Sequence, residues 1–307
     1  VYLGGSGTAS ITAGDVDNGS ADNCSVSSTT LDVSTFACAN IGSNTVTLTA
    51  ADASSNTATC TSTITVVDSS APTAVCQALT VYLNGTGTAT ITAGDVDNGS
   101  ADNCAISSST LDVSTFACAN IGANTVTLTT ADASSNSSTC SSVVTVVDST
   151  APTASCNNLT VYLDGTGNAS ITTGDVDNGS ADNCAVSSLN LDVSAFTCAT
   201  VGANTVTLTA ADASSNSATC SSTVTVVDSV APTAACQNLT VYLDGTGNAI
   251  ISATDVNNGS ADNCAISSTT LDVTTFACAM IGTNTVTLTT ADASSNTATC
   301  TSTVTVV

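Results

Sequence analysis

The segment ITAGDVDNGSADNC runs from Ile11 to Cys24, and close copies of it begin at Ile91, Ile171 and Ile251. The fourth copy reads ISATDVNNGSADNC, and the interval between copies is 80 residues throughout. A fixed period of this length is typical of a chain built from one repeated structural unit. We therefore predict four copies of one domain type, over residues 1–68, 69–148, 149–228 and 229–307.

The three prolines of the chain mark the predicted boundaries. Each stands in an Ala-Pro-Thr segment at the same position of its repeat, as in Ala71-Pro72-Thr73. Proline has no N–H for a central strand, so this segment predicts a linker that leads into a first strand. The first repeat begins at Val1, which aligns with Val81, and we expect it to lack the first strand.

The composition excludes several classes of function. The chain has 24 acidic residues, all Asp, and it has no Lys, Arg, His or Trp. Without basic residues it has no patch for nucleic acid or for an anionic membrane surface. Without His or Lys the usual general bases are absent, so we do not expect an enzyme. No apolar run approaches the roughly 20 residues of a membrane span, so we expect no membrane insertion.

Residues that favour strands fill each repeat and alternate with a period of two. Val126 and Leu128, for example, alternate with Thr127 and Thr129. In the second repeat we predict a hairpin of 73–83 and 88–91, a long loop over 94–103, and strands over 105–113, 124–130 and 139–147. About seven short strands in 80 residues, with no helical period, predict an all-β chain of four tandem immunoglobulin-like sandwiches.

Fifteen cysteines recur with the repeat, four in each complete copy. No CxxC pair occurs, and zinc sites usually need such pairs, so the pattern favours disulfides. Disulfides at this density indicate an oxidising, extracellular compartment.

Four cysteines in a repeat allow three pairings, and the spacing alone does not choose among them. If the first and last strands of the sandwich are neighbours, Cys76 faces Cys140, and Cys104 and Cys118 are left to pair. Cys60 then has no partner within the chain and is free or intermolecular. The full set expected on this basis is Cys24–Cys38, Cys76–Cys140, Cys104–Cys118, Cys156–Cys220, Cys184–Cys198, Cys236–Cys300 and Cys264–Cys278.

The combined motifs resemble a known family along every repeat. The pattern APTAxCQNLTVYLDGTGNA, DVDNGSADNC, GANTVTLTxADASSNxxTC and VTVVD is similar to hyaline-repeat (HYR-like) immunoglobulin-type modules. The resemblance is strongest to tandem versions in giant surface proteins and adhesins of gliding Bacteroidota. It implies an extracellular or bacterial cell-surface sandwich with an adhesive or scaffold role and no catalysis. The chain departs from the family in lacking basic and aromatic-rich surface.

Aspartates recur in the loops that we expect at the junctions between repeats. In the sandwich topology, two loops of one repeat project toward the last strand of the preceding repeat, which ends at Asp68. Converging carboxylates suit Ca²⁺, which binds six to eight oxygens, and no Lys or Arg offsets their repulsion. The candidate ligands are Asp15, Asp17, Asp22, Asp52, Asp68, Asp95, Asp97, Asp102, Asp132, Asp148, Asp175, Asp177, Asp182, Asp212, Asp228, Asp255, Asp262 and Asp292. The alternative is that these residues form turns in solvated loops, where Asp and Asn are common.

Two short motifs offer candidate glycosylation sites. The segments Asp148-Ser149-Thr150 and Asp228-Ser229-Val230 are similar to O-glycan acceptor motifs of the resembled bacterial group, which makes Ser149 and Ser229 candidates. Asn18-Gly19-Ser20 and its copies are formal N-glycan sequons. Unmodified hydroxyls on exposed strand faces explain the same residues.

These observations favour a structural subunit of an extracellular filament or rod, stiffened by disulfides and Ca²⁺. Its expected partners are other copies of itself, arranged head to tail, and glycans. The alternative is an adhesin stalk or a glycan-binding surface module. Threonine-rich strands such as Thr45–Thr49 also leave an ice- or mineral-binding array open.

Overall fold

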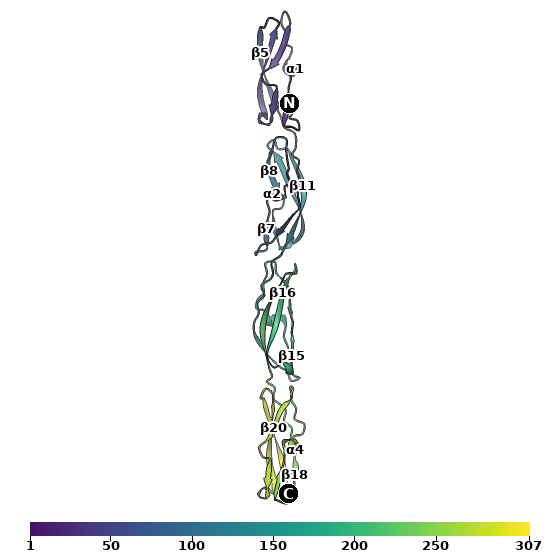
Figure 1. Ribbon diagram of the computed structural model, residues 1–307, viewed down its shortest axis with the longest axis vertical. Helices are drawn as coiled ribbons and strands as arrows, with labels where there is room; N and C mark the ends of the chain where they lie inside the picture. Colours follow the sequence, from purple (N-terminus) through teal and green to yellow (C-terminus); the bar gives the residue numbers. More distant parts are fainter. The chain divides into compact units, whose positions relative to one another are not determined.

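The computed structural model describes residues 1–307, and the chain forms two compact units, Val1–Thr150 and Ala151–Val307. Figure 1 follows the chain through both units, and each unit contains two of the 80-residue repeats. The division between the units falls two residues after the predicted boundary at residue 148. The boundaries predicted after residues 68 and 228 stay predictions.

Each complete repeat contains the same elements, and the second repeat serves as the reference. Its strands are β6 (Leu79–Tyr82), β7 (Thr88–Thr90), β8 (Ile106–Leu111), β9 (Thr115–Ala117), β10 (Gly122–Asp132) and β11 (Ser137–Val147). Its short helices are α2 (Ala93–Val96) and the 3-10 helix η2 (Cys118–Asn120). The 80-residue sequence period is therefore also a structural period.

The other three repeats follow the same order. The first has β1 (Thr8–Ser10), α1 (Ala13–Val16), β2 (Val26–Leu31), β3 (Thr35–Ala37), η1 (Cys38–Asn40), β4 (Gly42–Asp52) and β5 (Thr57–Val66). The third has β12 (Leu159–Tyr162), β13 (Asn168–Ser170), α3 (Thr173–Val176), β14 (Val186–Leu191), β15 (Ala195–Thr197), η3 (Cys198–Thr200), β16 (Gly202–Asp212) and β17 (Ser217–Val227). The fourth has β18 (Leu239–Val241), β19 (Asn248–Ile250), α4 (Ala253–Val256), β20 (Ile266–Leu271), β21 (Thr275–Ala277), η4 (Cys278–Met280), β22 (Gly282–Asp292) and β23 (Thr297–Val306).

Two sheets form the sandwich of each complete repeat. In the second repeat the larger sheet has the order β6-β11-β10-β8, and the smaller sheet pairs β7 with β9. The first strand, β6, lies parallel to the last strand, β11, with Leu79 opposite Val144. The first and last strands are therefore neighbours, and the chain is an all-β array of tandem immunoglobulin-like sandwiches, as predicted.

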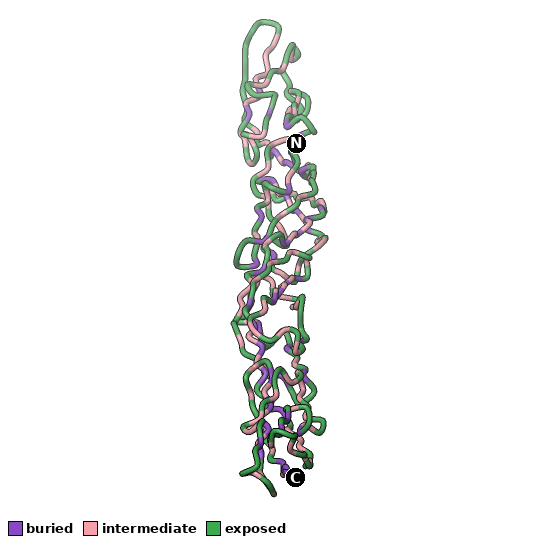
Figure 2. The backbone as a smooth tube through the Cα atoms, turned by 60° about the horizontal axis from the view of Figure 1, so that its bottom comes forward, coloured by how far each residue is buried: buried purple, intermediate pink, exposed green.

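The core of each sandwich consists of side chains that alternate along the strands. In the third repeat Phe196 of the small sheet packs with Val206, Leu208 and Val224 of the large sheet. Figure 2 shows buried residues as short stretches separated by half-buried and exposed ones. Because most core residues are aliphatic and the domain is small, each core buries little apolar surface, and covalent links contribute a large share of stability.

The predicted hairpin of residues 73–83 and 88–91 is wrong. The turn at 84–87 does not join paired strands, because β6 pairs with β11 and β7 pairs with β9. It carries the chain from the large sheet to the small one. The residues before β6 touch the sandwich elsewhere: Cys76 forms a bridge with Asp97, while Leu79 pairs with β11. A sequence alternation shows which residues share a face but not which sheet a strand joins.

The predicted absence of helices is also wrong, although the helices are very short. The loop predicted over 94–103 overlaps α2, a single turn of four residues. Asp95 accepts hydrogen bonds from the backbone N–H and the hydroxyl of Thr92, both at 2.7 Å. One turn of helix, closed by such a capping interaction, leaves too few residues for a helical period to be visible in the sequence.

Disulfides of two kinds hold the sandwiches. The first kind lies within a repeat, and its members are Cys76–Cys140, Cys156–Cys220 and Cys236–Cys300. The second kind joins consecutive repeats of a unit, and its members are Cys38–Cys104 and Cys198–Cys264. Cys24, Cys60 and Cys278 are free and exposed.

The second kind of disulfide overturns four predicted pairs: Cys24–Cys38, Cys104–Cys118, Cys184–Cys198 and Cys264–Cys278. Cys38 and Cys198 bond instead to cysteines of the following repeat. The predicted partners lie at opposite ends of a sandwich, because the six residues of β8 alone, between Cys104 and Cys118, span about 20 Å. A separation of fourteen residues is short along the sequence, but extended strands turn it into a long distance in space.

Candidate metal centre between consecutive repeats

Three aspartates of the first unit gather where its two repeats meet. Asp68 follows β5 of the first repeat, Asp102 lies between α2 and β8, and Asp132 ends β10. One carboxylate oxygen from each lies within 4.8 Å of the others. We name this group the junction cluster. Its counterpart in the second unit is Asp228, Asp262 and Asp292, with the same spacing.

Asparagine side chains hold the junction cluster together. Asn136 donates its Nδ2 to the backbone oxygen of Asp68 at 3.1 Å and to Oδ2 of Asp132 at 2.7 Å. Asn103 donates its Nδ2 to Oδ1 of Asp68 at 3.2 Å. The second unit repeats these contacts through Asn296 and Asn263. The two repeats of a unit therefore meet through a fixed set of polar groups.

The remaining oxygens of the cluster are those that a cation would use. Oδ2 of Asp68, Oδ1 of Asp102 and Oδ1 of Asn103 are buried and have no hydrogen-bond donor. Asp68 itself is only 4% exposed. Buried oxygens without a donor are costly unless something else satisfies them. The same three atoms are buried without a donor in the second unit, at Asp228, Asp262 and Asn263.

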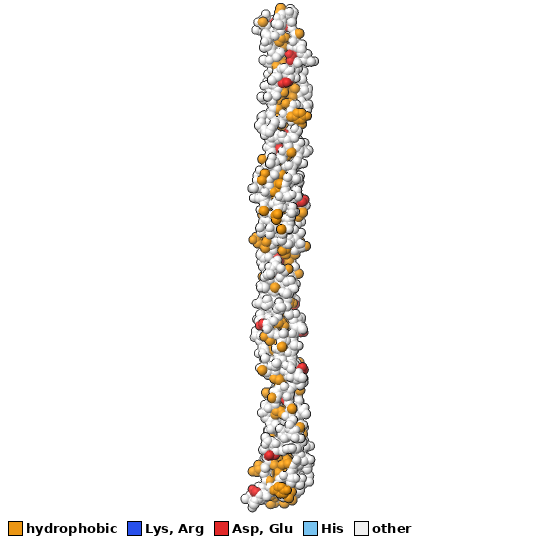
Figure 3. All heavy atoms as spheres, turned by 90° about the vertical axis from the view of Figure 1, so that its right-hand side faces the viewer, with side chains coloured by type: hydrophobic (Ala, Val, Ile, Leu, Met, Phe, Trp, Pro, Cys, Tyr) orange, Lys and Arg blue, Asp and Glu red, His pale blue; other side chains and the backbone are white.

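The electrostatics of the junction cluster favour a positive charge. Two carboxylates 4.8 Å apart repel by about 3.5 kcal/mol at an effective dielectric of about 20. The chain has no Lys, Arg or His to offset that repulsion, and Figure 3 accordingly shows no basic side chain on the face it presents. A bound cation would offset this repulsion.

The geometry fits Ca²⁺. Oxygens bound to one Ca²⁺ at about 2.4 Å are at most about 4.8 Å apart, and the three carboxylate oxygens lie within that limit of one another. The donors are carboxylate and amide oxygens, which a hard cation prefers over nitrogen or sulfur. Asp68 belongs to the first repeat, and Asp102 and Asp132 belong to the second. An ion held here would therefore bind both repeats.

Several aspartates that the sequence offered as ligands have local roles instead. Asp95 caps α2, and the N–H of Thr92, followed by its hydroxyl, holds the pKa of Asp95 below its usual value. The hydroxyl and N–H of Ser100 lower the pKa of Asp97 in the same way. The equivalent residues Asp15, Asp17, Asp175, Asp177 and Asp255 make the matching contacts in the other repeats. For these residues the turn and cap alternative is the observed one.

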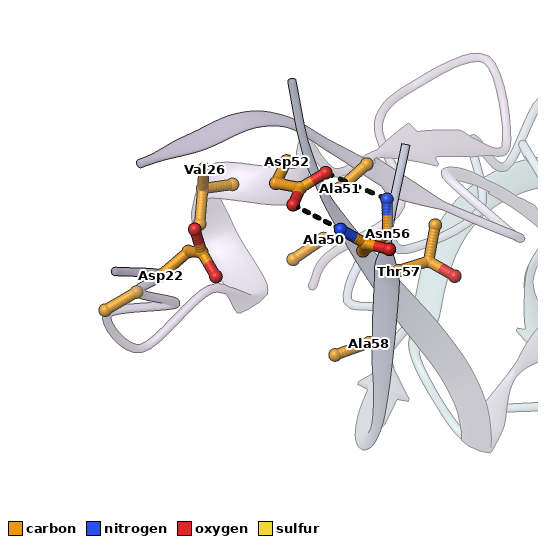
Figure 4. A pocket seen from close by; sticks show the side chains of 9 residues that line it. Asp22, Val26, Ala50, Ala51, Asp52, Asn56, Thr57 and Ala58 are labelled. Carbon is orange, nitrogen blue, oxygen red and sulfur yellow. Dashed lines mark hydrogen bonds between the residues drawn. The ribbon is translucent and has the colours of Figure 1, made fainter. Parts of the chain in front are cut away.

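The first repeat has the two equivalent carboxylates of a junction cluster, at Asp22 and Asp52. They lie on either side of a pocket, and Asn56 donates to Asp52 within it, as Figure 4 shows. These hydrogen bonds, the side chain of Asn56 first, hold the pKa of Asp52 below its usual value. The periodicity predicts the same ligand set at Asp148, Asp182 and Asp212, which stays a prediction.

Three features of the junction were not foreseen in the sequence. Cys104 follows Asp102 by two residues and bonds to Cys38, so a covalent link lies beside the carboxylates. Asn103 donates to the backbone oxygen of Gly4 at 3.2 Å, and Gly7 makes room for Asn103. The signal was present in the sequence, because these residues recur with the 80-residue period, but a period does not show contact across a boundary.

The helices of the structure are single turns of three or four residues, so none is long and apolar enough to cross a membrane.

Among known proteins, the chain is similar to solved structures of low sequence identity. No family model and no curated protein matches the chain. Extracellular cadherin domains 1–4 of protocadherin gamma B7 are 14% identical, with 87% of this chain and 84% of that one covered and a TM-score of 0.33. Three titin immunoglobulin domains are 10% identical, with 77% and 98% covered and a TM-score of 0.35. At such values the likeness carries no conclusion about function, and the hyaline-repeat resemblance stays a prediction.

Proposed function

We propose that this chain is an extracellular structural or adhesion module whose sandwiches are locked in series by disulfides and Ca²⁺. We further propose that its copies associate head to tail into a filament. The disulfides support an oxidising, extracellular setting, because thiols are kept reduced in the cytosol. The acidic composition and the small aliphatic cores support a role in which surface and connectivity matter more than a catalytic pocket.

One observation supports this function above the others: a covalent link and a candidate cation site occur at one junction. The Cys38–Cys104 disulfide and the junction cluster lie within two residues of each other on the chain, at Asp102 and Cys104. Either link alone leaves freedom of rotation between two repeats. Two links at separate points restrict that rotation, which is what a load-bearing series of domains needs and what a set of independent binding domains does not.

Electron microscopy of the purified, oxidised protein tests this function. In millimolar Ca²⁺ we expect straight filaments of uniform width, and in excess EDTA we expect shorter or more curved particles. The matched control is the variant D32N, which removes one negative charge outside the junction cluster. It weakens a contact within the first repeat, but its assembly should depend on Ca²⁺ as that of the wild type does. Separate, freely jointed beads in Ca²⁺ would instead favour an adhesin stalk over a filament subunit.

A further inference from the structure

The first repeat has an open groove along β5 and the end of β4. We name it the strand groove. One part is lined by Ser20, Ala21, Leu48, Ala50, Ala58, Thr59 and Cys60. It shares Ala21, Ala50 and Ala58 with the neighbouring pocket that Asp22 and Asp52 line, drawn in Figure 4. The strand groove therefore leads from a free thiol at one end to two carboxylates at the other.

The same surface is covered in the other repeats. Val16 is half-buried, whereas Val96 and Val256 are 0% exposed. Ser62 is half-buried, whereas its equivalent Ser302 is 1% exposed. Within the strand groove, Ala50 is half-buried, whereas its equivalent Thr130 is 0% exposed. The surface at and beside the strand groove is thus covered in the other repeats and more open in the first.

An extended segment covers the surface in the second repeat. Thr73 and Ala101 exchange backbone hydrogen bonds of 2.7 and 3.1 Å. Further along, the N–H of Gln77 donates to the oxygen of Val96 at 2.9 Å, and Cys76 bonds to Cys140. Asp68, at the start of this segment, joins the junction cluster. The segment is therefore fixed at both ends, by a carboxylate and by a disulfide.

The fourth repeat shows the same arrangement. Thr233 and Ala261 exchange backbone hydrogen bonds of 2.7 and 3.0 Å, and Gln237 donates to Val256 at 2.9 Å. The hydroxyl of Ser302 donates to the oxygen of Gln237 at 2.6 Å, and Cys236 bonds to Cys300. The covering segments share the pattern Asp-Ser-x-Ala-Pro-Thr-Ala-x-Cys-Gln.

The first repeat presents the matching groups for such a segment. Ala21 and Val16 occupy the positions of Ala101 and Val96, and Cys60 occupies that of Cys140, with an exposed thiol. Asp22 and Asp52 provide two of the three carboxylates of a junction cluster. A segment of this pattern would supply the third carboxylate at its first residue and a thiol eight residues later.

We propose that the strand groove is a docking site for an extended polypeptide segment of the pattern Asp-Ser-x-Ala-Pro-Thr-Ala-x-Cys, which bonds covalently to Cys60. The proposal deepens the head-to-tail association above, on which it rests, by naming the segment that the first repeat accepts. Backbone pairing sets the register, the segment cysteine reaches Cys60, and its aspartate completes a cation site with Asp22 and Asp52.

The covalent step needs an oxidant, for which oxidised glutathione serves. The Cys60 thiolate attacks one sulfur of oxidised glutathione, and one reduced glutathione leaves. The segment thiolate then attacks the Cys60 sulfur, the mixed disulfide breaks, and a second reduced glutathione leaves. Two thiols have lost two electrons and two protons, and one glutathione disulfide has become two thiols.

A non-reducing peptide map of the protein as isolated is the first measurement. An Asp-specific protease is suitable, because the chain has no Lys or Arg and the enzyme places Cys24, Cys60 and Cys278 in separate fragments. Cys60 bonded to a segment of the stated pattern supports the proposal. Cys60 bonded to Cys24 or Cys278 contradicts it.

If the Cys60 thiol is free, a synthetic peptide of residues 68–80, DSSAPTAVCQALT, decides the matter in a glutathione buffer. We expect it to be captured at Cys60 about 100-fold faster than a scrambled peptide with its cysteine at the same position, because docking raises the local thiol concentration. The variant C60S should abolish this capture, whereas C24S should leave it unchanged. Equal capture of the two peptides, or equal labelling of Cys24 and Cys278, overturns the proposal.

The cation arm separates this proposal from the filament proposal. A peptide with its first Asp replaced by Asn should still bond to Cys60, but its capture should no longer depend on Ca²⁺. These experiments read peptide capture, not assembly. Selective capture without filaments would support the docking site and contradict the filament function. Filaments without selective capture would support the filament function and contradict the docking site.

Discussion

At the scale of single residues, Gly7 shows how closely consecutive repeats approach. Its φ is +72°, which side-chain-bearing residues rarely adopt. A Cβ built on Gly7 would lie 2.5 Å from the backbone oxygen of Asn103 and 2.9 Å from Sγ of Cys38. The glycine thus makes room for the following repeat and for the disulfide at the same point. Gly167 has the same role in the second unit.

Replacing Gly7 by Ala should therefore weaken the Cys38–Cys104 link. The added Cβ would clash with Asn103 and with Cys38, so the two repeats would have to move apart. We expect an equilibrium constant about tenfold lower for the disulfide, which corresponds to about 1.4 kcal/mol. The measurement is the fraction of Cys38 bonded to Cys104 in a defined glutathione buffer. The control is G5A in the same turn, where no atom lies within 4 Å of the added Cβ. An equal fraction of disulfide in G7A, G5A and wild type would show that the repeats do not pack as described.

The roles of individual aspartates could be predicted only in part. The sequence placed them in turn-like loops, and its candidates included Asp68, Asp102 and Asp132, which the structure brings together. It could not separate Asp102 from Asp95 or Asp97, because the three lie within eight residues of one another in one loop. The direction of each side chain depends on whether α2 forms, and that single turn leaves no periodic signal.

At the scale of elements, Asp112 fixes the end of β8 against β10. Its Oδ1 accepts the N–H of Thr127 at 2.8 Å and the N–H of Val113 at 2.8 Å. The N–H of Thr127 is the main cause that holds the pKa of Asp112 below its usual value. The equivalent aspartates Asp32, Asp192 and Asp272 make the same contact to Thr47, Thr207 and Thr287. Each repeat thus has a charged contact that closes its large sheet.

This contact makes stability depend on pH in a defined direction. Since the folded pKa of Asp112 is lowered from 3.8, its stabilisation is present above that pH and is lost as the pH falls through the folded value. The variant D112N should be less stable than wild type by about 1 kcal/mol at neutral pH, since the contact is exposed. The difference should shrink below pH 3.8.

Denaturant unfolding at several pH values measures the effect of D112N. The control S114A is an uncharged change in the same turn, and its effect on the free energy of unfolding should not vary with pH. A D112N effect that stays constant from pH 7 to pH 3 would mean that the carboxylate of Asp112 is not held in its charged form.

The strands themselves were largely predictable, and their partners were not. The alternation around Val126 and Leu128 predicted the long strands of the large sheet. The structure confirms it, and both residues are fully buried. The hairpin at 84–87 failed because the turn residues are the same whether a chain pairs with itself or crosses to another sheet. Strand partners depend on packing between the sheets, which a local pattern does not contain.

At the scale of the whole molecule, the repeats are linked covalently in a way that sequence spacing concealed. The Cys38–Cys104 bond has a separation of 66 residues, against the 14 of the predicted pair. Closing a loop of that length lowers the entropy of the unfolded chain. In the loop-closure model this stabilises the folded state by about 4 kcal/mol. Disulfides across boundaries therefore stabilise neighbouring repeats together.

The charge of the chain gives the most general argument for the cation. A formal charge of −24 with no basic residue destabilises any compact arrangement of the repeats. The junction clusters concentrate that repulsion at the places where repeats must stay together. Cation binding at these clusters would convert a repulsive boundary into a cohesive one.

Thermal unfolding of the oxidised protein in millimolar Ca²⁺ and in excess EDTA measures whether a cation holds the repeats together. A ligand present at 100 times its dissociation constant stabilises the folded state by about 2.7 kcal/mol per site, so Ca²⁺ should raise the midpoint. The double variant D102N/D262N should lose much of this shift, and D32N should retain it. An unchanged midpoint of the wild-type protein between Ca²⁺ and EDTA would contradict the account.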